Sequence, residues 1–224
     1  MTKQIQIAID GPAAAGKSTI AKKTAELLGY TYVDTGAMYR AITYKAIQSN
    51  IDLQDEDKLT SLLKQTSIEL KPSPKGQQVF LDNQEVTEEI RSKEVTASVS
   101  VVAAHAELRK EMVRRQVEMG KNGSVVMDGR DIGTSVLTDA ELKIFMSASV
   151  EERAKRRFSE NNKRGIESSL EELMNDIELR DKLDSEREAS PLVQAEDAIF
   201  IDTTSLTIEE VSEKIMKLAK ERMA

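Results

Sequence analysis

Eight residues near the start of the chain have the types and the spacing of a loop that binds phosphate groups. They run from Gly11 to Ser18 and match the pattern G-x-x-x-x-G-K-[ST] without a gap. Glycines allow backbone N–H groups to turn inward around a phosphate chain, the lysine reaches the β- and γ-phosphates, and the serine hydroxyl contacts Mg²⁺. The pattern predicts a nucleoside triphosphate site in which Lys17 holds the terminal phosphates and Ser18 is a Mg²⁺ ligand.

A second motif places an acid where such a site needs one. The run 125–134 reads VVMDGRDIGT, a hydrophobic stretch that leads into Asp128. A strand that ends in an acid is typical of the element that holds Mg²⁺, and open parallel sheets bind ligands at the carboxyl ends of their strands. We predict that Asp128 acts on Mg²⁺ through water. The alternative is that Gly129 and Gly133 only mark a tight loop.

A cationic cluster lies further along the chain. Arg153, Arg156 and Arg157 are spaced so that they share one side of a helix, and a polar stretch follows at residues 161–165. One interpretation is a mobile lid that closes arginines over a triphosphate. The alternative is a solvated helix with Glu–Arg pairs.

A mixed cluster continues the apolar face of the next helix. Leu173 and Ile177 form an apolar stripe, and helical spacing carries that stripe on to Arg180, Asp184 and Arg187. Charges in this position either form an internal salt-bridge network or line a pocket for a polar ligand. In a pocket, arginine offers a planar fork to a phosphate or base edge, and aspartate accepts from a sugar hydroxyl.

The segment 34–40 follows the second expected strand. Thr35 is predicted to cap the next helix, and Arg40 is predicted to meet an acceptor phosphate at the edge where the phosphate loop lies. Asp34 is the nearest candidate for a general base if the acceptor is a hydroxyl group. His105, the only histidine, is predicted to be a surface or packing residue, because no partner cluster accompanies it.

These residues require a scaffold in which strands and helices alternate. The expected strands span 5–9, 30–33, 124–127, 142–146 and 198–201, and the expected helices span 18–28, 37–48, 57–64, about 88–118, 151–160, 170–184 and 208–222. This order indicates an α/β fold with a parallel sheet flanked by helices. Residues 67–87, with turns at 72–76 and 82–83, predict an inserted antiparallel meander.

Composition excludes several classes of function. The chain has 224 residues and a net charge of −7, which argues against nucleic acid as the main partner. It has no cysteine, so it forms no disulfide and no thiolate zinc site. No apolar run approaches the ~18 residues of a membrane span. We expect a cytoplasmic protein that binds no membrane and is a monomer.

The motifs together resemble a known family. GPAAAGKST at 11–19, DTGAMYRA at 34–41 and DGRDIGT at 128–134 are similar to the motifs of bacterial cytidylate kinases. The spacing of Arg180-Asp181 and Asp184…Arg187 ahead of Ser190-Pro191-Leu192 is similar too. The resemblance covers nearly the whole chain, including the meander. It implies a P-loop nucleoside monophosphate kinase fold with an inserted monophosphate-binding lobe and a helical lid.

The resemblance also implies an activity and a set of site residues. The activity is Mg²⁺-dependent, in-line transfer of the γ-phosphoryl group of ATP to CMP and dCMP. The implied ATP-binding residues are Gly11, Pro12, Ala13, Ala14, Ala15, Gly16, Lys17, Ser18 and Thr19. The implied CMP-binding residues are Thr35, Arg40, Ser100, Arg109, Arg130, Asp131, Arg180, Asp184 and Arg187. The implied catalytic residues are Lys17, Arg130, Arg153 and Arg157.

Two residues of that set impose a condition on the fold. Ser100 and Arg109 lie about 180° apart on a straight helix, so they share a site only if the helix breaks between them. Family members often have a proline here, and the run 104–107 has none.

The chain is expected to be a single kinase domain, residues 1–224. Its core is expected at 1–36, 88–148 and 170–224, the monophosphate-binding insert at about 37–87 and the lid at about 149–169. Three other functions remain open: a P-loop kinase for another small acceptor, a GTPase-type switch, and a nucleotide-binding regulator without turnover. The switch needs an N-K-x-D motif, and the nearest match, Asn162-Lys163-Arg164-Gly165, lacks the aspartate.

Overall fold

A five-stranded parallel sheet forms the centre of the molecule. The computed structural model describes residues 3–74, 76–121, 123–163 and 165–224. The strand order is β2-β6-β1-β7-β8, and each neighbouring pair is parallel. The strands are β1 (Gln6–Asp10), β2 (Thr31–Asp34), β6 (Val125–Gly129), β7 (Leu142–Ser147) and β8 (Ile199–Asp202). The predicted α/β class with a parallel sheet is confirmed.

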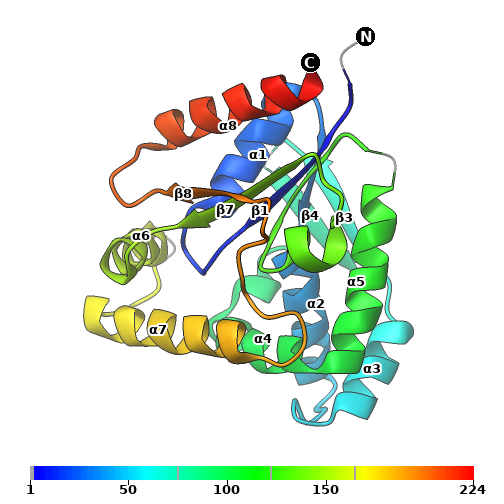
Figure 1. Ribbon diagram of the computed structural model, residues 1–224. Coiled ribbons are helices and arrows are strands. Elements are labelled where there is room, and N and C mark those ends of the chain that lie inside the picture. Colours follow the sequence, from blue (N-terminus) through cyan, green and yellow to red (C-terminus); the bar gives the residue numbers. More distant parts are fainter. Residues whose placement is uncertain (1–2, 75, 122, 164) are drawn as a thin grey trace.

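Helices cover both faces of this sheet (Figure 1). They are α1 (Lys17–Leu28), α2 (Thr35–Gln48), α3 (Glu56–Lys64), α4 (Lys93–Ala104), α5 (Ala106–Gly120), α6 (Val150–Lys163), α7 (Leu170–Glu186) and α8 (Ile208–Met223). Ile7 and Ile9 of β1 pack with α1 and α8, whereas Ala8 faces the opposite core. Because successive strand residues point to opposite faces, this short run is buried on both sides. None of the helices in the described part of the chain is long and apolar enough to cross a membrane.

The predicted meander is present as a separate antiparallel sheet. It consists of β3 (Ile68–Ser73), β4 (Gly76–Leu81) and β5 (Gln84–Glu85), paired in that order. Asp82 and Asn83 in the second turn both have positive φ, as a two-residue hairpin turn requires. The first expected turn, 72–76, includes Lys75, which lies outside the described residues.

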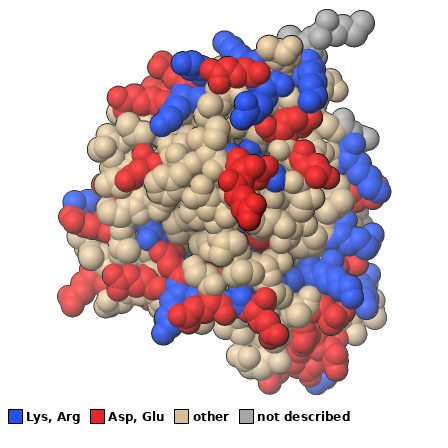
Figure 2. Space-filling view, viewed as in Figure 1, with Lys and Arg blue, Asp and Glu red and all other residues tan. Residues whose placement is uncertain are grey.

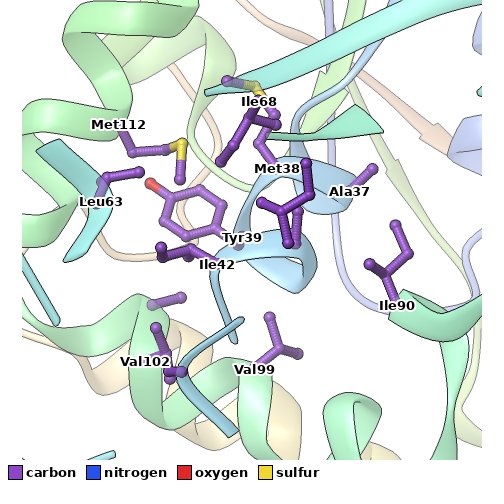
Figure 3. Packing of buried hydrophobic residues seen from close by; sticks show 14 of the residues in the cluster. Ala37, Met38, Tyr39, Ile42, Leu63, Ile68, Ile90, Val99, Val102 and Met112 are labelled. Carbon is purple, nitrogen blue, oxygen red and sulfur yellow. The ribbon is translucent and has the colours of Figure 1, made fainter. Parts of the chain in front are cut away.

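A second hydrophobic core joins the meander to the helices. Figure 3 shows Tyr39 and Ile42 of α2 surrounded by Leu63 of α3, Ile68 of β3 and Met112 of α5. Val99 and Val102 of α4 and Ile90 of the 3₁₀ turn Glu89–Arg91 complete this cluster. The insert is therefore packed against the helices through a core of its own.

The single helix expected over about 88–118 is wrong. The segment instead holds the 3₁₀ turn 89–91, α4 and α5, and the helix is interrupted at His105. His105 has an extended backbone, with φ −67° and ψ 123°, and its Nε2 lies 2.8 Å from the Leu53 carbonyl oxygen. His105 is thus a packing residue, as predicted, and it fixes the break. A further difference lies at α6, which continues to Lys163 instead of ending at Glu160; Arg164 of the expected polar stretch is outside the described residues.

Candidate functional site

A cavity of about 930 Å³ lies at the carboxyl ends of β1, β2 and β6. Its walls include the phosphate loop, α1, α2, α4, α5, the loop after β6, α6, α7 and the segment from Thr203 into α8. Cationic side chains outnumber acidic ones in this lining, although the whole chain carries a net charge of −7. Acidic and basic side chains are mixed over the face in Figure 2, so the cavity differs in charge from that face. A cationic cavity attracts anionic ligands.

The phosphate loop connects β1 to α1, as the sequence predicts. Gly11 has φ +146°, and a Cβ there would lie 1.9 Å from the Met146 carbonyl oxygen, so no larger residue fits. Gly16, with φ +89°, caps α1 in the left-handed conformation that glycine favours. Residues 13–19 line the cavity, whereas Gly11 and Pro12 lie behind it. The loop therefore presents the amino end of α1 to the cavity, an arrangement that binds anions.

Lys17 is held inside this loop. Its Nζ donates to the Pro12 carbonyl oxygen at 2.7 Å, and the residue is buried. Burial lowers the pKa of Lys17, and the nearby Arg130 guanidinium lowers it further. An anionic ligand would favour the charged ammonium in this setting.

Ser18 and Asp128 meet at the floor of the cavity. The Ser18 hydroxyl donates to Asp128 Oδ2 at 2.8 Å, and the Tyr32 hydroxyl donates to Oδ1 at 2.7 Å. Burial, together with the charge of Asp34, raises the pKa of Asp128. Both predicted Mg²⁺ residues thus lie together and line the cavity. Sequence reasoning missed Tyr32, because a tyrosine in a strand carries no motif.

The loop after β6 is anchored by an acid that sequence reasoning also missed. The Asp10 carboxylate accepts the N–H groups of Ile132 and Gly133, each at 2.7 Å, where a π-helical turn (Ile132–Val136) begins. Burial raises the pKa of Asp10 to about 6, although those two hydrogen bonds oppose the shift. This contact fixes the turn directly after Arg130 and Asp131, both of which line the cavity.

Paired arginines and aspartates form the part of the cavity wall that comes from α5, α7 and the loop after β6. Asp131 pairs with Arg109 at 2.5 Å and with Arg187 at 3.5 Å. Asp184 pairs with Arg130 at 2.8 Å, with Arg187 at 3.7 Å and with Arg180 at 3.9 Å. The side chains of the α7 stripe therefore form the predicted salt-bridge network, and they also line the cavity; that this cavity takes a polar ligand stays a prediction.

The break at His105 brings Ser100 and Arg109 into the same cavity. Because α5 starts in a new direction, the two residues are no longer on opposite sides of one helix. Arg109 is almost fully buried, donates to the Ala103 carbonyl oxygen at 3.0 Å and lies 5.2 Å from the centroid of the Tyr39 ring. Tyr39 lines the cavity too and was not predicted.

The start of α2 differs from the prediction. Asp34, not Thr35, is the capping residue: its Oδ1 accepts the Ala37 N–H at 2.8 Å. Its Oδ2 pairs with Arg40 at 2.9 Å. Burial alone would raise the pKa of Asp34. The Arg40 charge and the Ala37 N–H lower the pKa by more than burial raises it, so the net shift is downward. An acid with a lowered pKa and both oxygens engaged is a poor general base.

Thr35, Arg40 and an unpredicted residue complete this side of the cavity. The Thr35 hydroxyl donates to the Asp128 carbonyl oxygen at 2.8 Å and so ties α2 to β6. Arg91, in the 3₁₀ turn before α4, lines the cavity beside Arg40 and contributes to the lowered pKa of Asp34. No local pattern in the sequence marks Arg91 as a site residue.

The arginines of α6 do not all face the cavity. Arg153 is 4% exposed and does not line it; its guanidinium pairs with Asp181 at 2.6 Å and donates to the carbonyl oxygens of Ala148 at 2.9 Å and Ala13 at 3.3 Å. It supports the contact between α6, α7 and the phosphate loop, because every side of its guanidinium meets protein oxygen. Arg156 and Arg157 do line the cavity. The expected placement of Arg153 over a phosphate therefore differs from its position here.

Comparison with known proteins identifies relatives over the whole chain. The family model described as cytidylate kinase matches residues 7–221. The cytidylate kinase of Lysinibacillus sphaericus is 66% identical over 223 residues, covering 100% of both chains. That of Bacillus subtilis is 59% identical over 222 residues, covering 99% of both. A solved gluconokinase from Sinorhizobium meliloti shares only the fold, with a TM-score of 0.50 and 13% identity over 99% of this chain and 95% of its own. This chain belongs to the cytidylate kinase family.

Proposed function

We propose that the chain catalyses transfer of the γ-phosphoryl group of ATP to CMP and dCMP, which gives ADP with CDP or dCDP. One observation carries the proposal: a single cavity joins the phosphate loop to a second wall of paired arginines and aspartates. Its volume of about 930 Å³ is at the upper end of ordinary ligand pockets, which span about 300–1,000 Å³. Membership of the cytidylate kinase family supports the same reaction.

The donor end of the cavity would hold the triphosphate. Residues 13–19 line the cavity at the amino end of α1, and Lys17 lies within that loop. Ser18 and Asp128 carry oxygen atoms of the kind that Mg²⁺ prefers as ligands. Mg²⁺ is usually held by one or two such side chains together with substrate phosphates. These residues therefore fit Mg²⁺, which when bound would neutralise charge on the β- and γ-phosphates.

The opposite wall would hold the acceptor. Arg40 and Arg130 line the cavity, and Arg130 lies close enough to Lys17 to lower its pKa, so an acceptor phosphate held by Arg130 would lie near the donor. Deeper in, the buried pairs of Asp131 and Asp184 with arginines offer donors and acceptors to a sugar and a base. By family resemblance, Ser100 and Arg109 would contact cytosine, and the remaining acceptor residues would be Thr35, Arg180 and Arg187.

The chemistry requires alignment and charge stabilisation more than a base. The nucleophile is an oxygen of the acceptor phosphate, which is already ionised near neutral pH. The engaged carboxylate of Asp34, whose pKa is lowered, agrees with a reaction that needs no strong base. In-line transfer would be stabilised by Lys17 and by arginines that neutralise the moving phosphoryl group. Our candidates for this role are Arg130 and Arg157, which line the cavity, with Arg153 as a support for α6. Arg156 lines the cavity too, but its guanidinium bonds to Glu152 and Thr203.

Parts of the fold would move during the reaction. We assign residues of about 149–169 to a lid and about 37–87 to an acceptor-binding insert around a core of 1–36, 88–148 and 170–224. Closure would exclude water, which otherwise competes for the phosphoryl group. Arg153 of α6 donates to the carbonyl oxygen of Ala13 in the phosphate loop. Through this contact, triphosphate binding would move the lid toward the core.

The test is a comparison of initial rates with Mg·ATP and the acceptors CMP, dCMP, UMP, AMP, GMP and shikimate. We expect CMP and dCMP to be preferred, and we expect the rate to vanish when EDTA removes Mg²⁺. Preference for another acceptor would retain a P-loop kinase but refute the cytosine contacts of Ser100 and Arg109. Hydrolysis of ATP with no transfer to any of the six would refute the proposal.

A further inference from the structure

The strand that leads into the acceptor side of the cavity lies at an edge of the sheet. In the order β2-β6-β1-β7-β8, β2 pairs with β6 on one side only. The other side of an edge strand carries N–H and C=O groups that require partners from water or from another part of the chain. At Tyr32 and Asp34 these partners come from a side chain of the meander.

Gln77, at the start of β4, fills both positions. Its Nε2 donates to the Tyr32 carbonyl oxygen at 2.6 Å, and its Oε1 accepts the Asp34 N–H at 3.1 Å. A carboxamide carries a donor and an acceptor as a peptide group does, so one side chain continues the pairing of the edge strand. We call this pair of hydrogen bonds the Gln77 clamp.

The clamp acts at the residue on which the acceptor side of the cavity depends. Asp34 is the last residue of β2, caps α2 through the Ala37 N–H and holds Arg40 at 2.9 Å. Beyond Asp34 the chain leaves the sheet, where the bond from the Thr35 hydroxyl to the Asp128 carbonyl oxygen still ties it to β6. None of the meander residues 67–87 that the structure describes lines the cavity. The clamp thus links the meander to Arg40 through Asp34.

We propose that Gln77 is a positioning residue for the acceptor: by fixing the backbone at Asp34, it sets the position of Arg40. The inference rests on the proposed function, because it assigns Arg40 to the acceptor phosphate. It assigns the meander a role in acceptor binding that requires no contact between the meander and the ligand. Losing the clamp moves Arg40 while leaving the phosphate loop, on the other side of β6, in place.

The test compares neighbouring glutamines. Gln77→Met keeps the length of the side chain and removes both hydrogen bonds. Gln78→Met is the matched control, because Gln78 is the next residue of β4 and its amide, within the described part of the chain, bonds to the exposed Glu85 at 3.1 Å. The KM values for CMP and ATP are measured for both variants, with hydrogen exchange of the segment 31–40. If Gln77→Met does not fold, Gln77→Asn, which keeps the amide but is one methylene shorter, takes its place.

We expect Gln77→Met to raise the KM for CMP about tenfold, which corresponds to about 1.4 kcal/mol, from the loss of two hydrogen bonds. The KM for ATP should stay within about twofold, exchange at 31–40 should accelerate, and the control should match the wild type. Equal rises in both KM values, or a Gln77 variant that only melts earlier, would overturn the inference. If the wild type does not use CMP, the proposed function fails on its own, and unchanged exchange at 31–40 would still refute the clamp.

Discussion

The buried pair of Arg109 and Asp131 gives the sharpest test of how this cavity is built. Asp131→Asn keeps the shape of the side chain and removes the charge that faces Arg109 at 2.5 Å and Arg187 at 3.5 Å. Breaking a buried ion pair costs about 3–5 kcal/mol, because the remaining charge stays buried. Arg109 keeps its bond to Ala103 and its contact with Tyr39, so we expect the lower value, about 3 kcal/mol.

Urea unfolding at pH 7 measures this cost, and for a chain of this size it corresponds to a fall in Tm of about 6–12 °C. Adding Arg109→Met to Asp131→Asn should recover part of the loss, with an interaction energy of about 2 kcal/mol. Glu107→Gln is the control, because Glu107 and Lys110 form an exposed pair at 3.9 Å that should contribute under about 1 kcal/mol. Additive effects of the two buried substitutions would refute the reasoning.

Four further predictions follow from single contacts. Lys17→Ala should lower kcat at least about 100-fold in the phosphotransfer assay while circular dichroism shows an intact fold. Arg187→Ala should raise the KM for CMP far more than the KM for ATP, and equal rises would contradict its place in the acceptor wall. Burial raises the pKa of Asp10 from its ordinary value of 3.8 to about 6. Between these two pH values the Asp10 carboxyl is protonated in the folded chain and ionised in the unfolded chain. The free energy of unfolding should therefore fall by up to about 3 kcal/mol as pH rises from about 4 to 6, relative to Asp10→Asn, when both are unfolded in urea. Ala106→Pro should raise the free energy of unfolding by about 0.4–1 kcal/mol in the same assay. Ala106 is the first residue of α5, where proline is tolerated, and His105 before it already has an extended backbone. A lower Tm would contradict this.

The sequence was most informative where local pattern and function coincide. The phosphate loop could be placed because its glycines, lysine and serine occupy fixed positions between a strand and a helix. The stripe from Leu173 to Arg187 could be placed because helical spacing carries an apolar face directly into a charged one. In both cases neighbouring residues set the geometry, so spacing alone predicts which side chains converge.

Prediction failed where one long-range contact decides the geometry. The helix is interrupted at His105, whose ring contacts the carbonyl oxygen of Leu53, a residue distant in sequence. No proline marks this position in the sequence. Thr35 fits the composition of a helix cap as well as Asp34 does, and only the strand end shows which of the two meets the Ala37 N–H. Arg153 has the same spacing as the arginines beside it, but Asp181 and the phosphate loop surround it.

The aspartates explain how an acidic chain can hold a cationic cavity before any ligand binds. Burial lowers the pKa of Arg180, and the repulsion of the neighbouring guanidinium groups, above all that of Arg130, lowers it further. Asp131 and Asp184 offset this by pairing with the arginines of α5, α7 and the loop after β6. The arginines are therefore fixed in place in the free protein, and an anionic ligand needs only to share them with the aspartates. Removing an aspartate should then weaken the fold while leaving more positive charge for the ligand, so a bound nucleotide should restore more stability to Asp131→Asn than to the wild type.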